Sequence, residues 1–174
     1  MKESVFVESP TFQCFSLQRD LQEGLYHLPE VVQGLEKSPA VQAIFPDSHE
    51  LSEVLGRAMV RIRLGPGYMR VDNIDGTIIV AQDHLRFSDK KVVYLDFVHE
   101  LVHIKQVAEG RTIYGREVRY VDKDTELEAY GVVIKEGRRI GMTENELRDY
   151  LEVPWITEEE YKVLLRRLGI SPKT

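Results

Sequence analysis

The residues of this chain with the clearest potential for chemistry are two histidines four positions apart, His99 and His103. On a helix each residue turns about 100°, so residues four apart lie about 40° apart around the axis and project from one face. Two imidazoles placed in this way can bind one metal ion. Glu100 lies about 100° from His99 and about 60° from His103, close enough to reach a water on that metal without binding the metal itself. The pattern HExxH therefore predicts a metal site with a general base beside it.

A catalytic zinc needs three protein ligands and an open position, so the chain must supply one more donor. No histidine follows His103, which excludes the longer pattern with a third histidine six residues on. The candidate acids are Glu126 and Glu128, in a helix predicted between residues 124 and 136. With Leu127 at zero, Glu126 lies at about 260°, within the apolar arc of that helix, whereas Glu128 lies at about 100°, on its polar side. A carboxylate within a buried face needs a partner such as a zinc ion, so Glu126 is the predicted third ligand and Glu128 the alternative.

The element that must position the two histidines is a helix that begins at Ser88 or Asp89 and stops at Gly110. Its apolar residues fall on nearly every face: Val92, Val93, Leu95, Phe97, Val98, Leu101, Val102, Ile104 and Val107. A helix that is hydrophobic all round is a buried one. Polar groups set into it cost stability unless they are satisfied, which strengthens the interpretation as a metal site.

Strands are predicted before this helix, where the hydrophobic pattern changes. Apolar and polar residues alternate over Val60–Leu64, and short apolar segments follow at Tyr68–Val71 and Thr77–Gln82. Glycine-containing turns at Gly65–Gly67 and Asp72–Gly76 separate the three segments. Together they predict a small antiparallel meander.

Helices are predicted on both sides of these strands. The leucine spacing in the amino-terminal part predicts a helix over residues 16–28, and a cap at Asp47 or Ser48 begins a helix that runs to Met59. Capping boxes at 143–146 and 157–160 predict helices that end near residues 153 and 168. Residues 111–122 are expected to form a loop or a loose hairpin.

The 174 residues fit one domain. We divide it into a helical amino-terminal extension (1–45), a catalytic core (46–137) and carboxy-terminal helices (138–174). The predicted fold class is α+β: a small antiparallel or mixed sheet packs on the buried helix that carries His99 and on the following helix that carries Glu126, with extra helices at both ends.

The bulk composition narrows the partners. It is 43% hydrophobic and 30% charged, as in an ordinary globular protein. The net charge of −6 argues against a nucleic-acid partner, because phosphate binding needs a basic face. The single Cys14 excludes an intramolecular disulfide and a cysteine-rich metal site. The chain shows neither the apolar run of a signal peptide nor the roughly 18 apolar residues of a membrane helix, so we expect no membrane partner and a cytoplasmic location.

The order of these features resembles a known family. A helix, three strands, a helix with HExxH and a following helix with Glu-x-x-Ala, within residues 46–136, resemble the catalytic core of the gluzincin metallopeptidases, and the compact ImmA/IrrE-like peptidases in size and order. The resemblance implies a zincin-like fold, a Zn²⁺ cofactor bound by His99, His103 and Glu126, and a peptide or protein substrate. In that family the strand before the HExxH helix is the edge strand that binds extended substrate. The corresponding substrate-binding residues here are Ile79, Val80 and Ala81.

The implied reaction is hydrolysis of peptide bonds, in which Glu100 takes a proton from a zinc-activated water and passes it to the leaving amine. One position departs from the family, because related sequences often carry Asp or Asn where this chain has Tyr130. Tyr130 could make the hydrogen bond of that residue, or it could donate to the substrate oxyanion. Tyr114, Tyr120 and His84 are the other candidate donors.

Two other functions are compatible with the same residues. One is a catalytically silent zincin-like domain that serves as a binding or regulatory module, and the other is a hydrolase that acts on an amide outside peptides. Asp96 lies about 60° from His99 on the ligand face, where it could orient a histidine or be a polar residue at the cleft.

Overall fold

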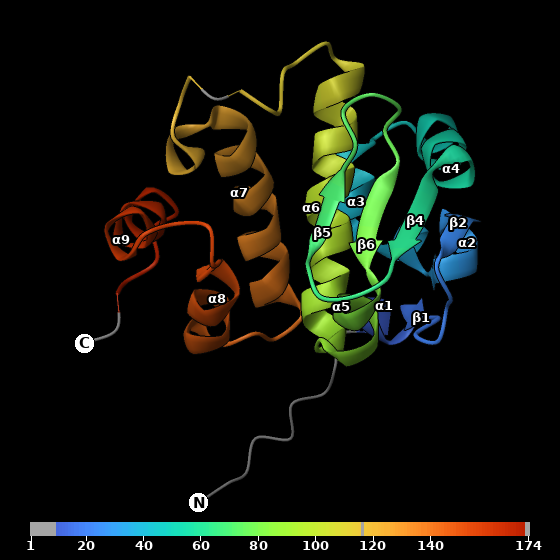
Figure 1. Ribbon diagram of the computed structural model, residues 1–174, viewed down its shortest axis with the longest axis horizontal. Coiled ribbons are helices and arrows are strands. Elements are labelled where there is room, and N and C mark those ends of the chain that lie inside the picture. Colours follow the sequence, from blue (N-terminus) through green and yellow to red (C-terminus); the bar gives the residue numbers. More distant parts are fainter. Residues whose placement is uncertain (1–9, 116, 173–174) are drawn as a thin grey trace, which may run out of the picture.

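The longest helix, α6 (Lys90–Ala108), lies between a β-sheet and α7 (Asp124–Arg139) in the computed structural model (Figure 1), which describes residues 10–115 and 117–172. The α+β class predicted from the sequence is confirmed. Within the described ranges, no helix is both long and apolar enough to cross a membrane.

Four strands form the main sheet, in the order β2 (Gly24–His27), β4 (Met59–Arg63), β6 (Ile78–Ala81) and β5 (Met69–Val71). β4 and β6 are parallel, and the other two neighbouring pairs are antiparallel. The three predicted strands are confirmed, but the antiparallel meander is wrong, because β6 inserts between β4 and β5. All four residues of β6 are apolar and buried, which suits a central strand, whereas β4 and β5 alternate between buried and exposed residues.

This strand order changes the predicted substrate edge. β6 is hydrogen-bonded on both sides, so the prediction that Thr77–Gln82 forms an edge strand is wrong. The edge strand beside α6 is β5. Its turn back into β6 is tight, with the Asp72 amide donating to the Thr77 carbonyl at 2.7 Å and the Gly76 amide to the Asp72 carbonyl at 2.8 Å.

The predicted helix over residues 16–28 is also wrong. This segment contains β1 (Ser16–Leu17), which pairs with β3 (Val32–Gln33), and it contains β2, which extends the main sheet. The leucines do not share a buried face, since the side chain of Leu25 is 50% exposed. Backbone pairing with β4 therefore overrides the local helical spacing. The amino-terminal extension is joined to the core through one sheet and is only partly helical, with short segments α1 (Pro10–Gln13), α2 (Leu28–Val31), η1 (Leu35–Lys37) and α3 (Pro39–Ile44).

The same extension braces α5 (Gln82–Phe87), a helix that the sequence did not predict. Arg19 donates from one guanidinium nitrogen to three carbonyl groups at the end of α5, at 2.9, 3.1 and 2.9 Å. At the start of α5, Gln82 donates to the carbonyl of Leu21 at 2.7 Å. Both ends of the helix that carries His84 are thus tied to the amino-terminal extension.

The remaining helices begin close to where the sequence places them. Asp47 caps α4 (Ser48–Arg57), and Thr143 and Thr157 form capping boxes that open α8 (Glu144–Leu151) and α9 (Glu158–Arg167). α7 begins one residue earlier than predicted, after Lys123. The segment between α6 and α7 contains a short 3₁₀ helix, η2 (Tyr120–Asp122), and no strand among its described residues.

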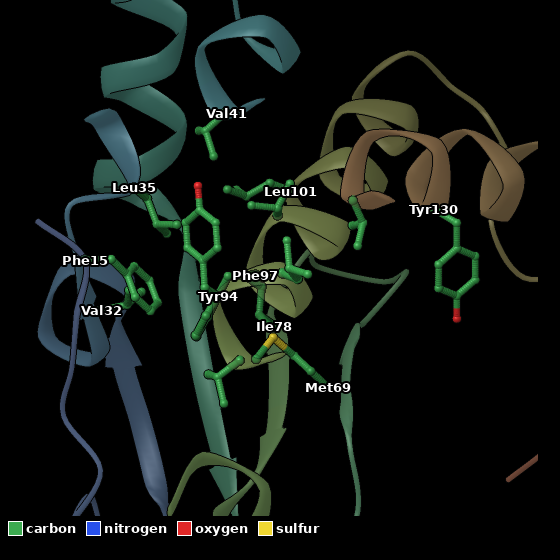
Figure 2. Close-up of a cluster of buried hydrophobic side chains, with 14 of the residues drawn as sticks. Phe15, Val32, Leu35, Val41, Met69, Ile78, Tyr94, Phe97, Leu101 and Tyr130 are labelled. Atoms are coloured by element: carbon green, nitrogen blue, oxygen red, sulfur yellow. The ribbon is translucent and has the colours of Figure 1, made fainter. Parts of the chain in front are cut away.

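α6 is fixed to its neighbours by apolar packing and by one buried polar network. Phe97 and Leu101 lie among the side chains between α6 and the sheet, while Tyr130 extends from α7 on the other side (Figure 2). The hydroxyl of Tyr94 donates to the buried carboxylate of Glu136 on α7 at 2.5 Å. Because Glu136 lies on α7, this contact holds the carboxy-terminal part of α7 against α6.

Candidate metal centre

His99 and His103 project from one face of α6, as their spacing predicts. Their ring centroids are 4.6 Å apart, and the two residues are only 7% and 4% exposed. α6 begins after Asp89, whose side chain accepts a hydrogen bond from the amide of Lys91 at 2.8 Å. The two imidazoles therefore lie side by side in the middle of a capped and buried helix.

Glu126, in the first turn of α7, completes the group. Its Oε2 atom lies 3.4 Å from Nε2 of His99 and 3.6 Å from Nε2 of His103. One ligand atom from each of the three residues lies within 4.8 Å of the others, and within the described part of the chain no other group of three such residues could hold a metal ion. The prediction that Glu126 lies on the buried face of its helix and Glu128 on the polar face is confirmed. Glu126 is buried, and the side chain of Glu128 is 49% exposed.

The unsatisfied atoms of the group fit a cation. Oε2 of Glu126 is buried and receives no hydrogen bond of normal length from any described residue, because its two contacts with the imidazoles are long ion pairs. A buried carboxylate oxygen without a donor is costly. A metal ion between the three side chains would satisfy this oxygen and both Nε2 atoms together. The buried His99, His103 and Glu126 group could therefore hold a metal ion.

The charges of the metal-free group are shifted by burial and by one another. Burial opposes protonation of His103, but Glu126 and Glu100 outweigh it and raise the pKa of His103 to about 9. Burial also disfavours the charged form of Glu126, but the two imidazoles hold the pKa of its carboxyl well below the usual range. The metal-free site therefore contains an imidazolium and a carboxylate at neutral pH.

The stability of the metal-free protein is accordingly expected to fall as the pH rises from about 6.5 to about 9. The pKa of His103 is raised in the folded state, so its stabilising charge is fully present below the unfolded pKa and is lost as the pH passes the folded pKa. We expect a decrease in the free energy of unfolding of about 1 to 3 kcal/mol, measured by urea denaturation across this range. His103→Gln should remove the decrease and His49→Gln, at an exposed histidine, should keep it. An unchanged pH profile in His103→Gln would contradict the assignment.

Glu100 lies beside the ligands and faces the same cleft. It is 5% exposed, and its Oε2 atom is buried without a hydrogen-bond partner in the part of the chain that the structure describes. Burial raises the pKa of Glu100, although the charges of His99 and His103 oppose that rise. A carboxylate with one unengaged oxygen and a raised pKa has the properties of a proton acceptor.

Tyr130 does not make the hydrogen bond expected of the Asp or Asn found in related sequences. Its ring packs edge-on against His99 with centroids 4.7 Å apart, and Nδ1 of His99 has no hydrogen-bond partner among the described residues. The Tyr130 hydroxyl instead lies 2.8 Å from the Tyr120 hydroxyl. Burial raises the pKa of both phenols, so both stay protonated as possible donors.

The other candidate donors have partners of their own. The hydroxyl of Tyr114 donates to the carbonyl of Val71. Nε2 of His84 lies 2.6 Å from Oδ2 of Asp96, whose other oxygen accepts from Tyr150 at 2.8 Å. Asp96 thus contacts His84 and not His99 or His103, and it lines the cleft as a polar residue.

A cleft of about 1100 Å³ opens over the ligand group. Its lining includes β5 and the loop before it, α5, α6, the first turns of α7, and α8. The predicted substrate contacts Ile79 and Ala81 line it, but Val80 is fully buried and does not. Among the described residues none before Arg63 lines the cleft, so residues 10–45 of the amino-terminal extension form no part of its wall.

Three features of the site were missed from the sequence. Tyr68 and Trp155 meet edge-on at the cleft, with centroids 5.1 Å apart, although they lie far apart in the chain. The pair formed by His84 and Asp96 also depends on tertiary packing. Gln106, which contacts His103, could have been found: it is a polar residue three positions after a ligand, in a helix whose other faces are apolar.

Comparison of the chain with models of protein families, with curated proteins and with solved structures gives no match. A function for this protein must therefore be inferred from the fold and from the geometry of the site.

Proposed function

We propose that this protein is a zinc-dependent metallopeptidase with a zincin-like fold. The observation that carries the proposal is the buried group of His99, His103 and Glu126 with Glu100 beside it, at the floor of an open cleft. Two imidazole nitrogens and one carboxylate oxygen are a donor set of catalytic zinc sites, which keep a fourth position open. Structural zinc sites use four protein ligands and are closed.

Bound zinc would activate a water and polarise the carbonyl of the scissile peptide bond. In the proposed reaction Glu100 accepts the proton of the attacking water and delivers it to the leaving amine. Its Oε2 atom supports this role because no group in residues 10–115 or 117–172 donates a hydrogen bond to it.

The phenol pair of Tyr120 and Tyr130 is the proposed donor to the developing oxyanion. Within the pair one hydroxyl donates to the other, and the accepting hydroxyl keeps its own proton for the substrate. Tyr130 lies against His99, and both tyrosines line the cleft. These contacts favour the pair over Tyr114, whose hydroxyl is engaged by Val71.

We propose that extended substrate pairs with β5. The amide of Ala81 donates to the Tyr68 carbonyl and the amide of Asp72 to the Thr77 carbonyl, so residues 68 and 72 face β6. In an antiparallel pair the intervening Met69 and Val71 then face the opposite edge, where a peptide can add as a strand. Met69 offers its amide and carbonyl there, and Val71 its amide, because the carbonyl of Val71 already accepts from Tyr114. The side chains of Ile79 and Ala81 remain predicted substrate contacts.

The proposal is tested by stripping the purified chain with a chelator, reloading it with Zn²⁺ and incubating both forms with unfolded proteins and peptide pools. We expect new peptide termini, identified by mass spectrometry, in the zinc-loaded sample and none in the stripped one. A chain that binds zinc at these residues but cleaves nothing would contradict the peptidase proposal and support a silent binding module. A chain that binds no zinc would contradict the metal centre as well.

A further inference from the structure

Gln106 connects His103 to the start of α7. It lies on α6 and is 1% exposed. Its Oε1 atom is 2.8 Å from Nδ1 of His103, and its Nε2 atom donates to the carbonyl of Thr125 and to Oε2 of Glu128, each at 3.0 Å. A single buried amide thus contacts one histidine of the metal group and the residue that precedes Glu126.

These contacts fix the orientation of the amide. The Thr125 carbonyl and the Glu128 carboxylate can only accept hydrogen bonds, so the NH₂ group of Gln106 must face them and its oxygen must face His103. Nδ1 of His103 must then carry a hydrogen. When the ring is neutral, as metal binding requires, Nε2 is the atom with the lone pair. Nε2 is the atom that faces Glu126.

The other histidine has no such support. Nδ1 of His99 is buried and no described residue forms a hydrogen bond with it, while the ring packs against Tyr130. The Glu128 carboxylate, in contrast, is held from a second side by Arg111, at 2.5 Å. The two histidines therefore differ: the tautomer of His103 is set by hydrogen bonding, and that of His99 is not.

We propose that Gln106 is a positioning residue that sets the metal-binding tautomer of His103 and, through Thr125, holds the α7 backbone that carries Glu126. An amide suits this role because one side chain must supply an acceptor to the imidazole and donors to two acceptors. The inference rests on the proposed metal centre but not on peptide hydrolysis, so its test measures metal binding.

The test compares zinc affinity, by competition with a chromophoric chelator, and the absorption spectrum of the Co²⁺-loaded protein. Gln106→Met keeps the size of the side chain and removes its hydrogen bonds. We expect it to lower zinc affinity by about 10- to 100-fold, as residues that orient metal ligands typically do, and to shift the Co²⁺ spectrum. Gln82→Met is the matched control, because Gln82 is another buried glutamine that donates to a backbone carbonyl, outside the cleft lining. It should change neither affinity nor spectrum.

A second pair of variants exchanges the amide of Gln106 and the carboxylate of Glu128. It shows whether the hydrogen bonds of Gln106 matter or only its volume, and it tests the proposal even if Gln106→Met does not fold. Gln106→Glu alone keeps an acceptor for His103 but places two carboxylates together, so affinity should fall. Adding Glu128→Gln restores an amide opposite a carboxylate, and affinity should recover at least in part. Wild-type affinity in Gln106→Met, an equal loss in Gln82→Met, or no recovery in the exchanged pair would each overturn the proposal. A wild-type chain that binds no metal would refute the metal centre and this role together.

Discussion

Replacing Glu100 by glutamine is expected to lower peptide hydrolysis by about 10²- to 10⁴-fold, the usual contribution of a general base, while zinc content stays the same. The amide keeps the shape of the side chain but cannot accept the proton of the attacking water. Because burial raises the pKa of Glu100, its charged form is unfavourable in the folded protein, and the neutral amide should leave thermal stability unchanged or higher at neutral pH. The expected result is therefore an inactive protein that is folded and loaded with zinc.

The measurement combines initial rates of peptide cleavage with metal analysis and thermal unfolding of the same preparation. Glu109→Gln is the matched control, since this glutamate is exposed at the end of α6 and does not line the cleft. Retention of full activity in Glu100→Gln would refute the proposed base. If Glu100→Gln instead loses activity because it unfolds or loses zinc, the proposal that Glu100 acts by proton transfer is refuted.

Replacing Glu126 by alanine should weaken zinc binding by more than about 100-fold, because residues that only orient ligands already cost 10- to 100-fold when they are removed. Zinc at 100 times its dissociation constant should stabilise the wild-type protein by about 2.7 kcal/mol, and Glu126→Ala should lose most of this stabilisation at the same zinc concentration. Chelator competition and zinc-dependent thermal unfolding measure the two effects. At neutral pH the change also removes the carboxylate that pairs with His103 in the metal-free protein, so metal-free unfolding is measured in parallel.

Glu128→Ala provides the comparison within the same helix turn. Glu128 contacts Gln106 and Arg111 but lies outside the group of three ligand atoms. Its loss should reduce zinc affinity less than the loss of Glu126 does. The reverse order of the two variants would identify Glu128 as the third ligand and contradict the proposed site.

The features predicted correctly from the sequence depend on local geometry. The face shared by His99 and His103 follows from helical spacing, and the start of α6 follows from the cap at Asp89. Glu126 was selected because the apolar arc of its helix had to be buried, and that arc packs against α6. None of these inferences required knowledge of how distant segments meet.

The errors arose where pairing between distant segments decides the structure. The position of β6 between β4 and β5 depends on a parallel pairing that no local pattern specifies, although its unbroken apolar run was a signal. Likewise, β2 forms because β4 offers its free edge, whereas the leucine spacing alone favoured a helix. The partners of Gln106 could not be predicted, since two of them come from α7.

The third ligand occupies a different kind of position from the two histidines. Glu126 lies in the first turn of α7, whereas His99 and His103 lie within the longest helix. Helix ends open locally at a much lower free energy than buried helix centres. In the metal-free protein the first turn of α7 should therefore exchange its amide hydrogens before the centre of α6 does, and Tyr120 in the adjoining η2 should move with it. A bound ion would join this end to α6, so zinc should slow amide exchange in the first turn of α7 and in η2 more than at the centre of α6.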